Sequence, residues 1–471
     1  MKQLSQESVN KLSEIKYMGI DLYRYVSEIL CLFDFSAEAE NNQCFNSVYP
    51  DEIKLYIDSD KAQIYIDSFF DSLYESDILF SLSPNRKLIN GEMYHTSVDP
   101  YIDTVSDMNY IAIELQFGAS DSSDIPIHTK KHRKYITNAV LSHYGLSKVN
   151  KQDFYSFLDR EFFALIEETE HISLYDFQKK NIQSSLLYYL TIRNAFVSFY
   201  SDILNVVNPK TICYSHGAMC YMCFLYEAAS QRGIPCFEID HGSYARERVL
   251  PPSAAHTDYY LSFSKLTSDI SRCNGLENVI PIGKPFVLAN SGVPKPNMPT
   301  KVVCIISSAE EDLLSIAARL SAELDPNEYT VLYKQHSAED LTSENNRALT
   351  DGSPNLTIIN SAVDVNDIFK ISSIIIGERS TALLEALPYA HIKVLIKGRE
   401  NDDLFLPHHK LGFFNDIIQN EEMVKTNDYE EIKEAILKYD IHDTYRPNGD
   451  IYWVEDAEVN FRKLMESHIG Q

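Results

Sequence analysis

The sequence has little of several features that mark special classes of protein. Glycine and proline are scarce, 16 and 18 among 471 residues, which excludes collagen-like and low-complexity architectures. No run approaches the roughly 20 apolar residues that a membrane-spanning helix needs, and the first residues lack the apolar core of a signal peptide. We therefore expect a cytoplasmic protein, with peripheral association at the inner face of the cytoplasmic membrane left open.

Cysteine is present, but without a pattern that points to chemistry. The eight cysteines are scattered and form no disulfide framework. Cys220 and Cys223 make a C-x-x-C, but no second pair stands at zinc-site spacing, and both fall in a segment predicted to be a buried helix. The spaced acids Asp58 and Asp60 lie far from the strand–helix motifs below. We expect no metal site and no cofactor.

Positive charge is also in short supply. The 42 basic and 68 acidic residues leave a formal charge of −26, so the surface repels phosphate backbones and no nucleic-acid partner is expected. A nucleotide-sized anion can still bind, because a few N–H groups and one or two cations suffice. The basic stretch "HTKKHRKY", residues 128–135, is predicted to be a solvated loop; contact with an anionic membrane or a phosphorylated acceptor is the alternative.

What the sequence does contain is the pattern of parallel α/β structure. Residues 9–35 and 137–207 have helical spacing of apolar residues. From Thr211 a β-rich run, a helix-length segment and a second β-rich run follow within about thirty residues, the βαβ pattern of a parallel sheet. The segment 287–300, "VLANSGVPKPNMPT", has three prolines and no apolar period, so we predict a linker there.

A second strand–helix series follows that linker and extends to Lys397, without the G-x-G-x-x-G turn of dinucleotide enzymes. We therefore predict two Rossmann-type, doubly wound α/β domains facing across a cleft, with a helical N-terminal elaboration. The predicted boundaries are 1–290 for the first domain, which carries the helical insertions, 300–450 for the second domain, and 451–471 for a closing helix.

Polar residues stand where predicted strands end, and ligands of parallel sheets bind at those ends. In "YTVLYKQH", strand alternation would point Lys334 and His336 the same way, as a phosphate-binding pair. In "SIIIGERSTALLEAL", Gly377 permits a tight turn, and Ser380 or Thr381 can cap the next helix and leave N–H groups for an anion. A surface Lys with a tethered His, and an ordinary capped helix, are the structural alternatives.

Glu385 is more informative than the cap beside it. It occupies neither capping-box position, and on a helical wheel it lies roughly opposite the leucines of its helix. It is predicted to face either water or the cleft, where its carboxylate could accept hydrogen bonds from ribose hydroxyls.

The first domain offers a constellation of its own, "EIDHGSYARER". Asp240 and His241 follow a predicted strand, and an imidazole beside a carboxylate can serve as a general base. Ser243 and Arg246 lie in the same predicted loop. His216 is a lower-ranked candidate because no acid neighbours it. The alternative for His241 is a loop tether.

These motifs, in this order over residues 209–397, resemble those of bacterial GT-B-fold glycosyltransferases of surface-polysaccharide synthesis. "GIPCFEIDHGSYARE" looks like their "QHG" segment, "YKQH" like K-x-H-P, and "GERSTALLEALPYAHIKV" like G-x-x-ST-x-x-x-EA. CDP-glycerol glycerophosphotransferases and the sialyl- and Kdo-type transferases share the pattern. The chain departs from it at Ser337, where the family has proline, and at His241, where the sialyl motif has a second acid.

The resemblance implies a GT-B-like fold and a role for each matching residue. Asp240 or His241 would deprotonate the acceptor hydroxyl, and His336, aided by Lys334, would contact the donor phosphate. Ser380 and Thr381 would hold phosphate and Glu385 the ribose. Ser307, next to last in the run "KVVCIISS", completes the donor-side set. The resemblance also makes 1–290 the acceptor-side domain, with Ser243, Arg246 and His216 on the acceptor side, and 300–450 the nucleotide-donor-binding domain.

The sequence thus predicts a metal-independent glycosyltransferase that extends a surface glycan (capsule, O-antigen or lipooligosaccharide) from a nucleotide-sugar donor. CMP-sugars are favoured, with UDP and CDP donors as alternatives. Its partners would be the donor and a glycan or lipid-linked glycan acceptor. Three alternatives remain: a CDP-glycerol-type polyol-phosphate transferase, a UDP-N-acetylglucosamine 2-epimerase-like isomerase, and a non-catalytic scaffold of a polysaccharide assembly complex.

Overall fold

The structure is a computed structural model. It describes residues 4–26, 59–83, 87–89, 92–95, 97–115, 133–136, 139–215, 220–240, 257–273, 276–285, 300–307, 311–336, 339, 341, 349, 353, 355–361, 363–378, 380–386, 389, 392–397, 424–426, 428–439 and 454–470. Statements of absence below concern these residues.

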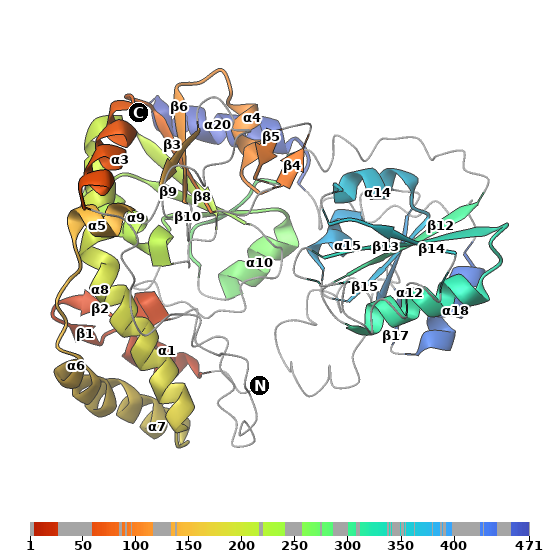
Figure 1. The fold of residues 1–471 in the computed structure, drawn as a ribbon, viewed down its shortest axis with the longest axis horizontal. Helices are drawn as coiled ribbons and strands as arrows, with labels where there is room; N and C mark the ends of the chain where they lie inside the picture. Colours follow the sequence, from red (N-terminus) through yellow and green to blue (C-terminus); the bar gives the residue numbers. More distant parts are fainter. Residues whose placement is uncertain are drawn as a thin grey trace.

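The described chain forms two lobes, each built around a parallel sheet (Figure 1). The first sheet has seven strands in the order β11-β10-β9-β8-β3-β6-β7, and every neighbouring pair is parallel. The strands are β3 (Ile78–Leu82), β6 (Tyr110–Leu115), β7 (Arg133–Ile136), β8 (Thr211–Ser215), β9 (Cys236–Ile239), β10 (Tyr259–Ser262) and β11 (Val279–Pro281). From β3 the chain runs outward one way through β7 and then returns to run the other way through β11, so this sheet is doubly wound.

Helices cover both faces of the first sheet, because alternate strand residues point to opposite faces and both sets are apolar. The helices are α1 (Gln6–Leu12), α3 (Ser59–Asp71), α4 (Asp99–Thr104), α5 (Ala139–Tyr144), α6 (Lys151–Phe157), the π-helical segment η3 (Leu158–Phe163), α7 (Ala164–Glu170), α8 (Asp176–Val207), α9 (Cys220–Ser230), α10 (Lys265–Cys273) and α20 (Ala457–Ile469). The stretch 137–207, predicted to be helical, therefore supplies α5 to α8.

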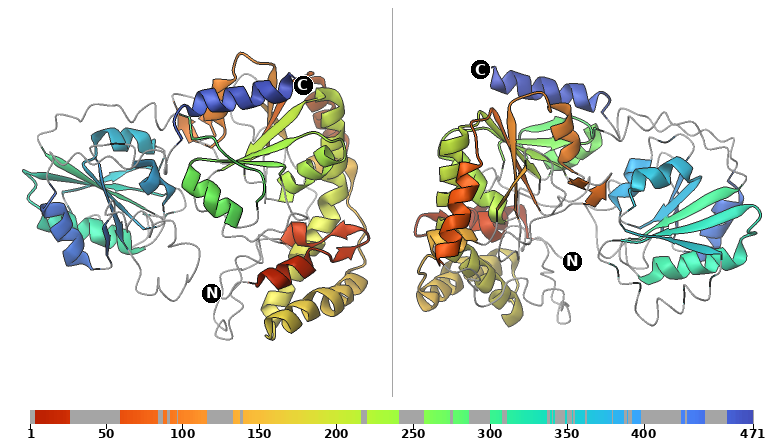
Figure 2. Two further views of the ribbon diagram at one scale, coloured as in Figure 1. Left: turned by 180° about the vertical axis from the view of Figure 1, so that it is seen from behind. Right: turned by 45° about the horizontal axis from the view of Figure 1, so that its top comes forward.

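The last helix of the chain belongs to the first lobe. Phe461 and Met465 of α20 are fully buried in one apolar cluster with Phe80 and Phe237 of the first sheet. Figure 1 and both views of Figure 2 show α20 lying along this lobe, although the second lobe precedes it in sequence. The chain consequently crosses between the lobes twice.

The second sheet has six parallel strands in the order β14-β13-β12-β15-β16-β17. They are β12 (Lys301–Ile306), β13 (Tyr329–Lys334), β14 (Leu356–Ile359), β15 (Ile374–Gly377), β16 (Lys393–Lys397) and β17 (Val424–Thr426), and the helices are α12 (Glu311–Glu323), α14 (Val365–Ile371), α15 (Thr381–Ala386) and α18 (Tyr429–Leu437). α14 and α15 cover one face, α12 and α18 the other. The prediction of two doubly wound α/β domains is confirmed.

The prediction of a helix over residues 9–35 is wrong at residues 13–22: the chain is helical at 9–12 and again at 23–26, and residues 27–35 lie outside the described residues. Helix α1 ends at Leu12, and an antiparallel hairpin follows, β1 (Lys16–Tyr17) and β2 (Ile20–Asp21). Met18 and Gly19 both have positive φ, +51° and +81°, which a helix cannot accommodate. The helical spacing of apolar residues here arises because both α1 and the hairpin pack against the helices of the first lobe.

The basic stretch 128–135 also differs from its prediction as a solvated loop. Residues 128–132 lie outside the described residues, but Arg133 starts β7 and is 5% exposed. Its guanidinium forms ion pairs with Asp99 and, at 3.3 Å, with Glu114. Burial alone would lower the pKa of Arg133, but the two carboxylates outweigh it and raise that pKa.

None of the helices described is both long and apolar enough to cross a bilayer.

Candidate functional site

Each sheet has a switch point, where the connections that follow two neighbouring strands run to opposite sides of the sheet. Open α/β sheets bind their ligands at such points. In the second lobe the switch point lies between β12 and β15. Ser307 directly follows β12 and is 2% exposed, and Gly377 ends β15. Both predicted donor-side residues thus flank the same switch point, together with the buried Glu378.

Gly377 is needed there for packing. A Cβ at this position would lie 3.0 Å from Leu383 Cδ2 and 3.3 Å from the carbonyl oxygen of Ile306. The glycine therefore lets α15 approach the ends of β12 and β15 closely. Ser380 Oγ accepts a hydrogen bond from the Ala382 N–H at 3.3 Å, so Ser380 acts as a cap and Thr381 begins the helix.

Lys334 and His336, predicted as a same-facing phosphate-binding pair, differ in burial. β13 ends at Lys334, so strand alternation does not extend to His336. Lys334 is 5% exposed, and its ammonium donates to the carbonyl oxygens of Asn360 and Ser361, both at 3.0 Å. His336 is exposed, and its backbone N–H donates to Glu339 Oε2. The lysine therefore ties the ends of β13 and β14 together.

Glu385 faces the first lobe. It is 8% exposed, and its carboxylate forms an ion pair with Lys284, the residue that follows Gly283 beyond β11. The ammonium of Lys284 also lies 5.2 Å from the centroid of the Phe263 ring, which follows β10. Phe263 itself belongs to the apolar cluster beneath α14 and α15 of the second lobe. The carboxyl ends of β10 and β11 therefore contact α15 directly.

Asp240 lies at the neighbouring strand end of the first sheet. It follows β9, is 2% exposed, and its N–H donates to the carbonyl oxygen of Leu261. The buried Tyr101 of α4 donates its hydroxyl to the Gly283 carbonyl oxygen at 2.6 Å. Burial first, and then the charge of Asp240, raise the pKa of Tyr101 well above its ordinary value. Tyr101 thus remains a neutral donor that fixes the backbone beside Lys284.

We call the group Tyr101, Asp240, Gly283, Lys284 and Glu385 the interdomain junction. The hairpin β4 (Lys87–Ile89) and β5 (Glu92–Tyr94) lies on the side of the first lobe that faces α14 in Figure 1. The negative charge of Asp364, which caps α14, contributes to the raised pKa of Tyr94, after burial and nearer acids.

The first sheet has its own switch point, between β3 and β8. Ser83, just after β3, is 1% exposed, and its hydroxyl lies 3.0 Å from Nε2 of the fully buried His95. The Val98 N–H donates to Nδ1 of His95 at 3.2 Å, so the ring proton sits on Nε2 and points to Ser83. His95 is held as a neutral, oriented ring.

Sequence reasoning missed Lys284, Tyr101, Ser83 and His95. The signal for Lys284 was available, because "VIPIGKP" places a lysine at a strand end just as "YTVLYKQH" does. His241, His216, Ser243 and Arg246 lie outside the described residues. Among the residues that are described, no group of three His, Cys, Asp or Glu side chains could hold a metal ion.

No protein-family model matches the chain, and no curated protein matches it in sequence. Solved structures similar to it include a UDP-GlcNAc 2-epimerase from Neisseria meningitidis, at 12% identity, covering 84% of this chain and 100% of that one, with a TM-score of 0.49. The wall teichoic acid polymerase TagF matches at 12% identity, over 88% of this chain and 94% of that one, with a TM-score of 0.47. MurG of Acinetobacter baumannii matches at 10% identity, over 84% and 98%, with a TM-score of 0.42. These are distant likenesses of fold.

Proposed function

We propose that the chain is a glycosyltransferase that moves a sugar from a nucleotide-activated donor, CMP-sugars favoured over UDP and CDP donors, to a growing surface glycan. The observation that supports this most is the interdomain junction, where the carboxyl ends of one parallel sheet contact the helix after a switch-point strand of the other. Ligands of open α/β sheets bind outside those ends. A donor and an acceptor held by different lobes would meet there.

The reaction would be a displacement at the anomeric carbon. The acceptor oxygen forms a bond to that carbon, the bond from the carbon to the donor phosphate breaks, and the phosphate leaves with the electron pair. The acceptor proton passes to Asp240 or His241. Positive charge and N–H donors near the leaving phosphate stabilise it as the bond breaks. His336, Lys334, Ser380 and Thr381 are the proposed groups for this, without a metal ion.

Glu385 is the proposed ribose ligand. Its burial at the junction supports this role, and its ion pair with Lys284 means that a ribose hydroxyl would share the carboxylate with the lysine. A carboxylate has about four lone-pair sites, so it can accept both partners.

The proposal is tested first by nucleotide binding. We expect CMP to raise the melting temperature of the protein more than CDP, UDP, GDP or dTDP does, since a ligand of the folded state stabilises it by mass action. Glu385→Gln should reduce that rise, whereas Glu323→Gln, an exposed acid on α12, should leave it unchanged. A larger rise with CDP would favour the polyol-phosphate transferase, and a larger rise with UDP would favour a UDP-sugar donor or the epimerase. No rise with any nucleotide would overturn the assignment.

The second test separates an enzyme from a scaffold. We expect His336→Ala and His241→Ala each to lower surface-glycan output in vivo, measured at matched protein levels, because both imidazoles are assigned to the transfer step. His171→Ala, at the C-terminal end of α7, is the control. Normal glycan output from both site variants would favour the scaffold.

A further inference from the structure

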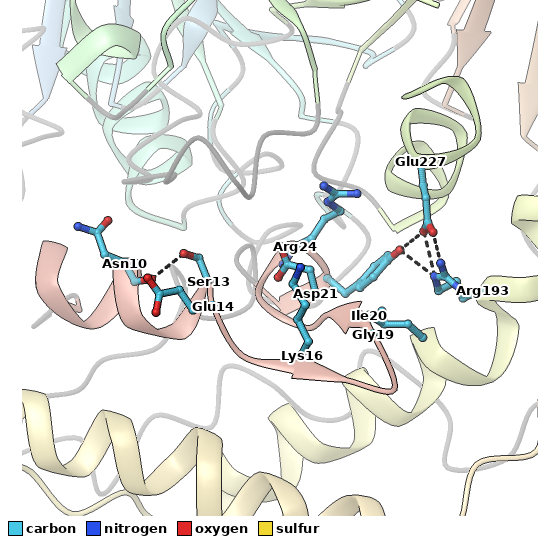
Figure 3. Close-up of a pocket in the computed structure, with 11 residues that line it drawn as sticks. Asn10, Ser13, Glu14, Lys16, Gly19, Ile20, Asp21, Arg24, Arg193 and Glu227 are labelled. Carbon is cyan, nitrogen blue, oxygen red and sulfur yellow. Dashed lines mark hydrogen bonds and ion pairs between the residues drawn. The ribbon is translucent and has the colours of Figure 1, made fainter. Parts of the chain in front are cut away.

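A large polar pocket lies in the first lobe, apart from the interdomain junction. It has a volume of about 930 Å³ and is bounded by α1, the β1–β2 hairpin, α8 and α9 (Figure 3). Its lining residues are Asn10, Ser13, Glu14, Lys16, Gly19, Ile20, Asp21, Arg24, Tyr25, Arg193 and Glu227.

The position of the pocket follows from the contacts of Arg24. The guanidinium carbon lies 5.6 Å from the centroid of the Tyr226 ring, and the Tyr226 hydroxyl donates to Asp258 at 3.1 Å. Asp258 precedes β10 and also accepts the N–H of Cys236, the first residue of β9. The Arg24 side of the pocket is therefore near the amino ends of β9 and β10, whereas Asp240 lies at the carboxyl end of β9.

One wall of the pocket is already neutralised. Arg193 forms an ion pair with Glu227, with Nε 2.9 Å from Oε2, and the Tyr25 hydroxyl donates to the same oxygen at 2.5 Å. Figure 3 shows this pair on one side of the pocket and Asn10, Ser13 and Glu14 on the other. The ion pair leaves this wall of the pocket without net charge.

Arg24, between those two sides, is different. Its Nε is buried, and within the part of the chain that the structure describes this atom makes no hydrogen bond. A buried donor without an acceptor destabilises the folded state, so a ligand oxygen that accepts from it would be favoured. The Tyr226 ring face orients the guanidinium without occupying its N–H donors, which suit a carboxylate or a phosphate.

The rest of the lining suits hydroxyl groups. Lys16 lies directly across the hairpin from Asp21, and both line the pocket with Glu14. Carboxylates accept from hydroxyls and the ammonium donates to them, so a polyol finds both kinds of partner. Among the lining residues that the structure describes, Ile20 alone has an aliphatic side chain, so most of the side chains there can form hydrogen bonds.

We propose that this pocket binds a carbohydrate that carries a carboxylate or a phosphate, with the anion held by Arg24 and Lys16 and the hydroxyls by Glu14 and Asp21. Its volume admits a ligand of several sugar units. We identify this ligand with a segment of the acceptor glycan, and that identification rests on the proposed function. The binding of a charged saccharide does not depend on it. The pocket would anchor the glycan at a distance from the transferring end.

The test is calorimetric titration and saturation-transfer NMR with 3′-sialyllactose, glucose 6-phosphate and lactose. We expect at least one charged saccharide to bind more tightly than lactose, and which one it is separates carboxylate from phosphate. Arg24→Gln should weaken that binding about tenfold or more. Lys16→Gln, at an exposed position that tolerates change, should weaken it by a smaller factor. Arg160→Gln removes the same charge from an exposed arginine outside the pocket and should have no effect.

Two results would overturn the inference: neither charged saccharide binds more tightly than lactose, or Arg24→Gln and Lys16→Gln both bind as Arg160→Gln does. The nucleotide measurement distinguishes this failure from that of the proposed function. Nucleotide stabilisation without charged-saccharide binding removes only the pocket's role. Charged-saccharide binding without nucleotide stabilisation leaves the pocket and removes the transferase.

Discussion

At the scale of single residues, the structure changes the meaning of Glu385 most. Its helical position predicted only that it faces away from the leucines, toward either water or a ligand. The structure adds Lys284, about a hundred positions earlier, as its partner. No local pattern pairs these residues, because the contact depends on how two separately folded sheets meet. The helical wheel singled out Glu385, whereas Lys284 was missed, and tertiary packing joins the two.

We predict that Lys284→Met destabilises the protein by about 3–5 kcal/mol, because it leaves the Glu385 carboxylate buried without its cation. Lys370→Met removes an exposed lysine that pairs with Asp367, and should cost less than about 1 kcal/mol. Chemical denaturation of the two variants checks this. Adding Glu385→Leu to Lys284→Met should restore part of the loss; equal stabilities of the two single variants would contradict the prediction.

A second residue-scale prediction concerns pH. Burial, the largest cause, raises the pKa of Tyr25 from 10 to about 12. The stability this neutral hydroxyl contributes is complete below pH 10 and is lost as the pH rises toward 12, a contribution on the order of 2 kcal/mol. The free energy of unfolding of Tyr25→Phe should therefore approach that of the wild type between pH 10 and 12. If the difference in unfolding free energy between the wild type and Tyr25→Phe stays constant between pH 10 and 12, this prediction is wrong.

At the scale of elements, the strand–helix alternation was predictable and the N-terminal hairpin was not. Strands β8 to β16 are short β-rich runs bounded by turn residues, so local composition and tertiary structure agree. In residues 9–26 the apolar spacing is compatible with a helix, but the positive φ of Met18 and Gly19 decides for a turn. The spacing of apolar residues indicates which residues are buried, but it does not distinguish this hairpin from a helix. The positive φ values at the turn make that distinction.

Gly283 links two elements and carries the third prediction. Its φ is +86°, and a Cβ there would lie 2.5 Å from the Val454 carbonyl oxygen and 2.8 Å from Ala457 Cβ, at the start of α20. Gly233 also has positive φ, +66°, but open space around it. Gly233→Ala should cost about 1 kcal/mol for backbone strain. Gly283→Ala should cost about 1–3 kcal/mol more, because α20 must shift. Thermal unfolding of both variants measures the difference, and equal losses would exclude the packing contribution.

At the scale of the whole molecule, two domains could be predicted from length and from two separate strand–helix series. The return of the chain to the first lobe could not. The segment 454–470 is amphipathic, which predicts a helix, but an amphipathic helix fits any apolar face. Phe461 and Met465 fill a surface between α4 and the first sheet that exists only after that sheet has formed. The polar pocket could not be predicted from the sequence either, because its lining residues lie far apart in the chain, between positions 10 and 227.

The arrangement of the lobes depends on the junction, and this gives the last prediction. Lys284→Glu would place two carboxylates face to face where an ion pair now joins β11 to α15. Separating the lobes would relieve this repulsion at a lower free-energy cost than unfolding either lobe, because each sheet keeps its own core. We expect a larger radius of gyration by small-angle X-ray scattering.

The reversed pair Lys284→Glu with Glu385→Lys should return the radius to the wild-type value, because the attraction is restored with its sign exchanged. Lys370→Glu, on the exposed side of α14, makes the same charge change away from the junction and should leave the radius unchanged. If the single Lys284→Glu variant keeps the wild-type radius, the two chain crossings and the packing of Phe263 against the second lobe hold the lobes together without the ion pair.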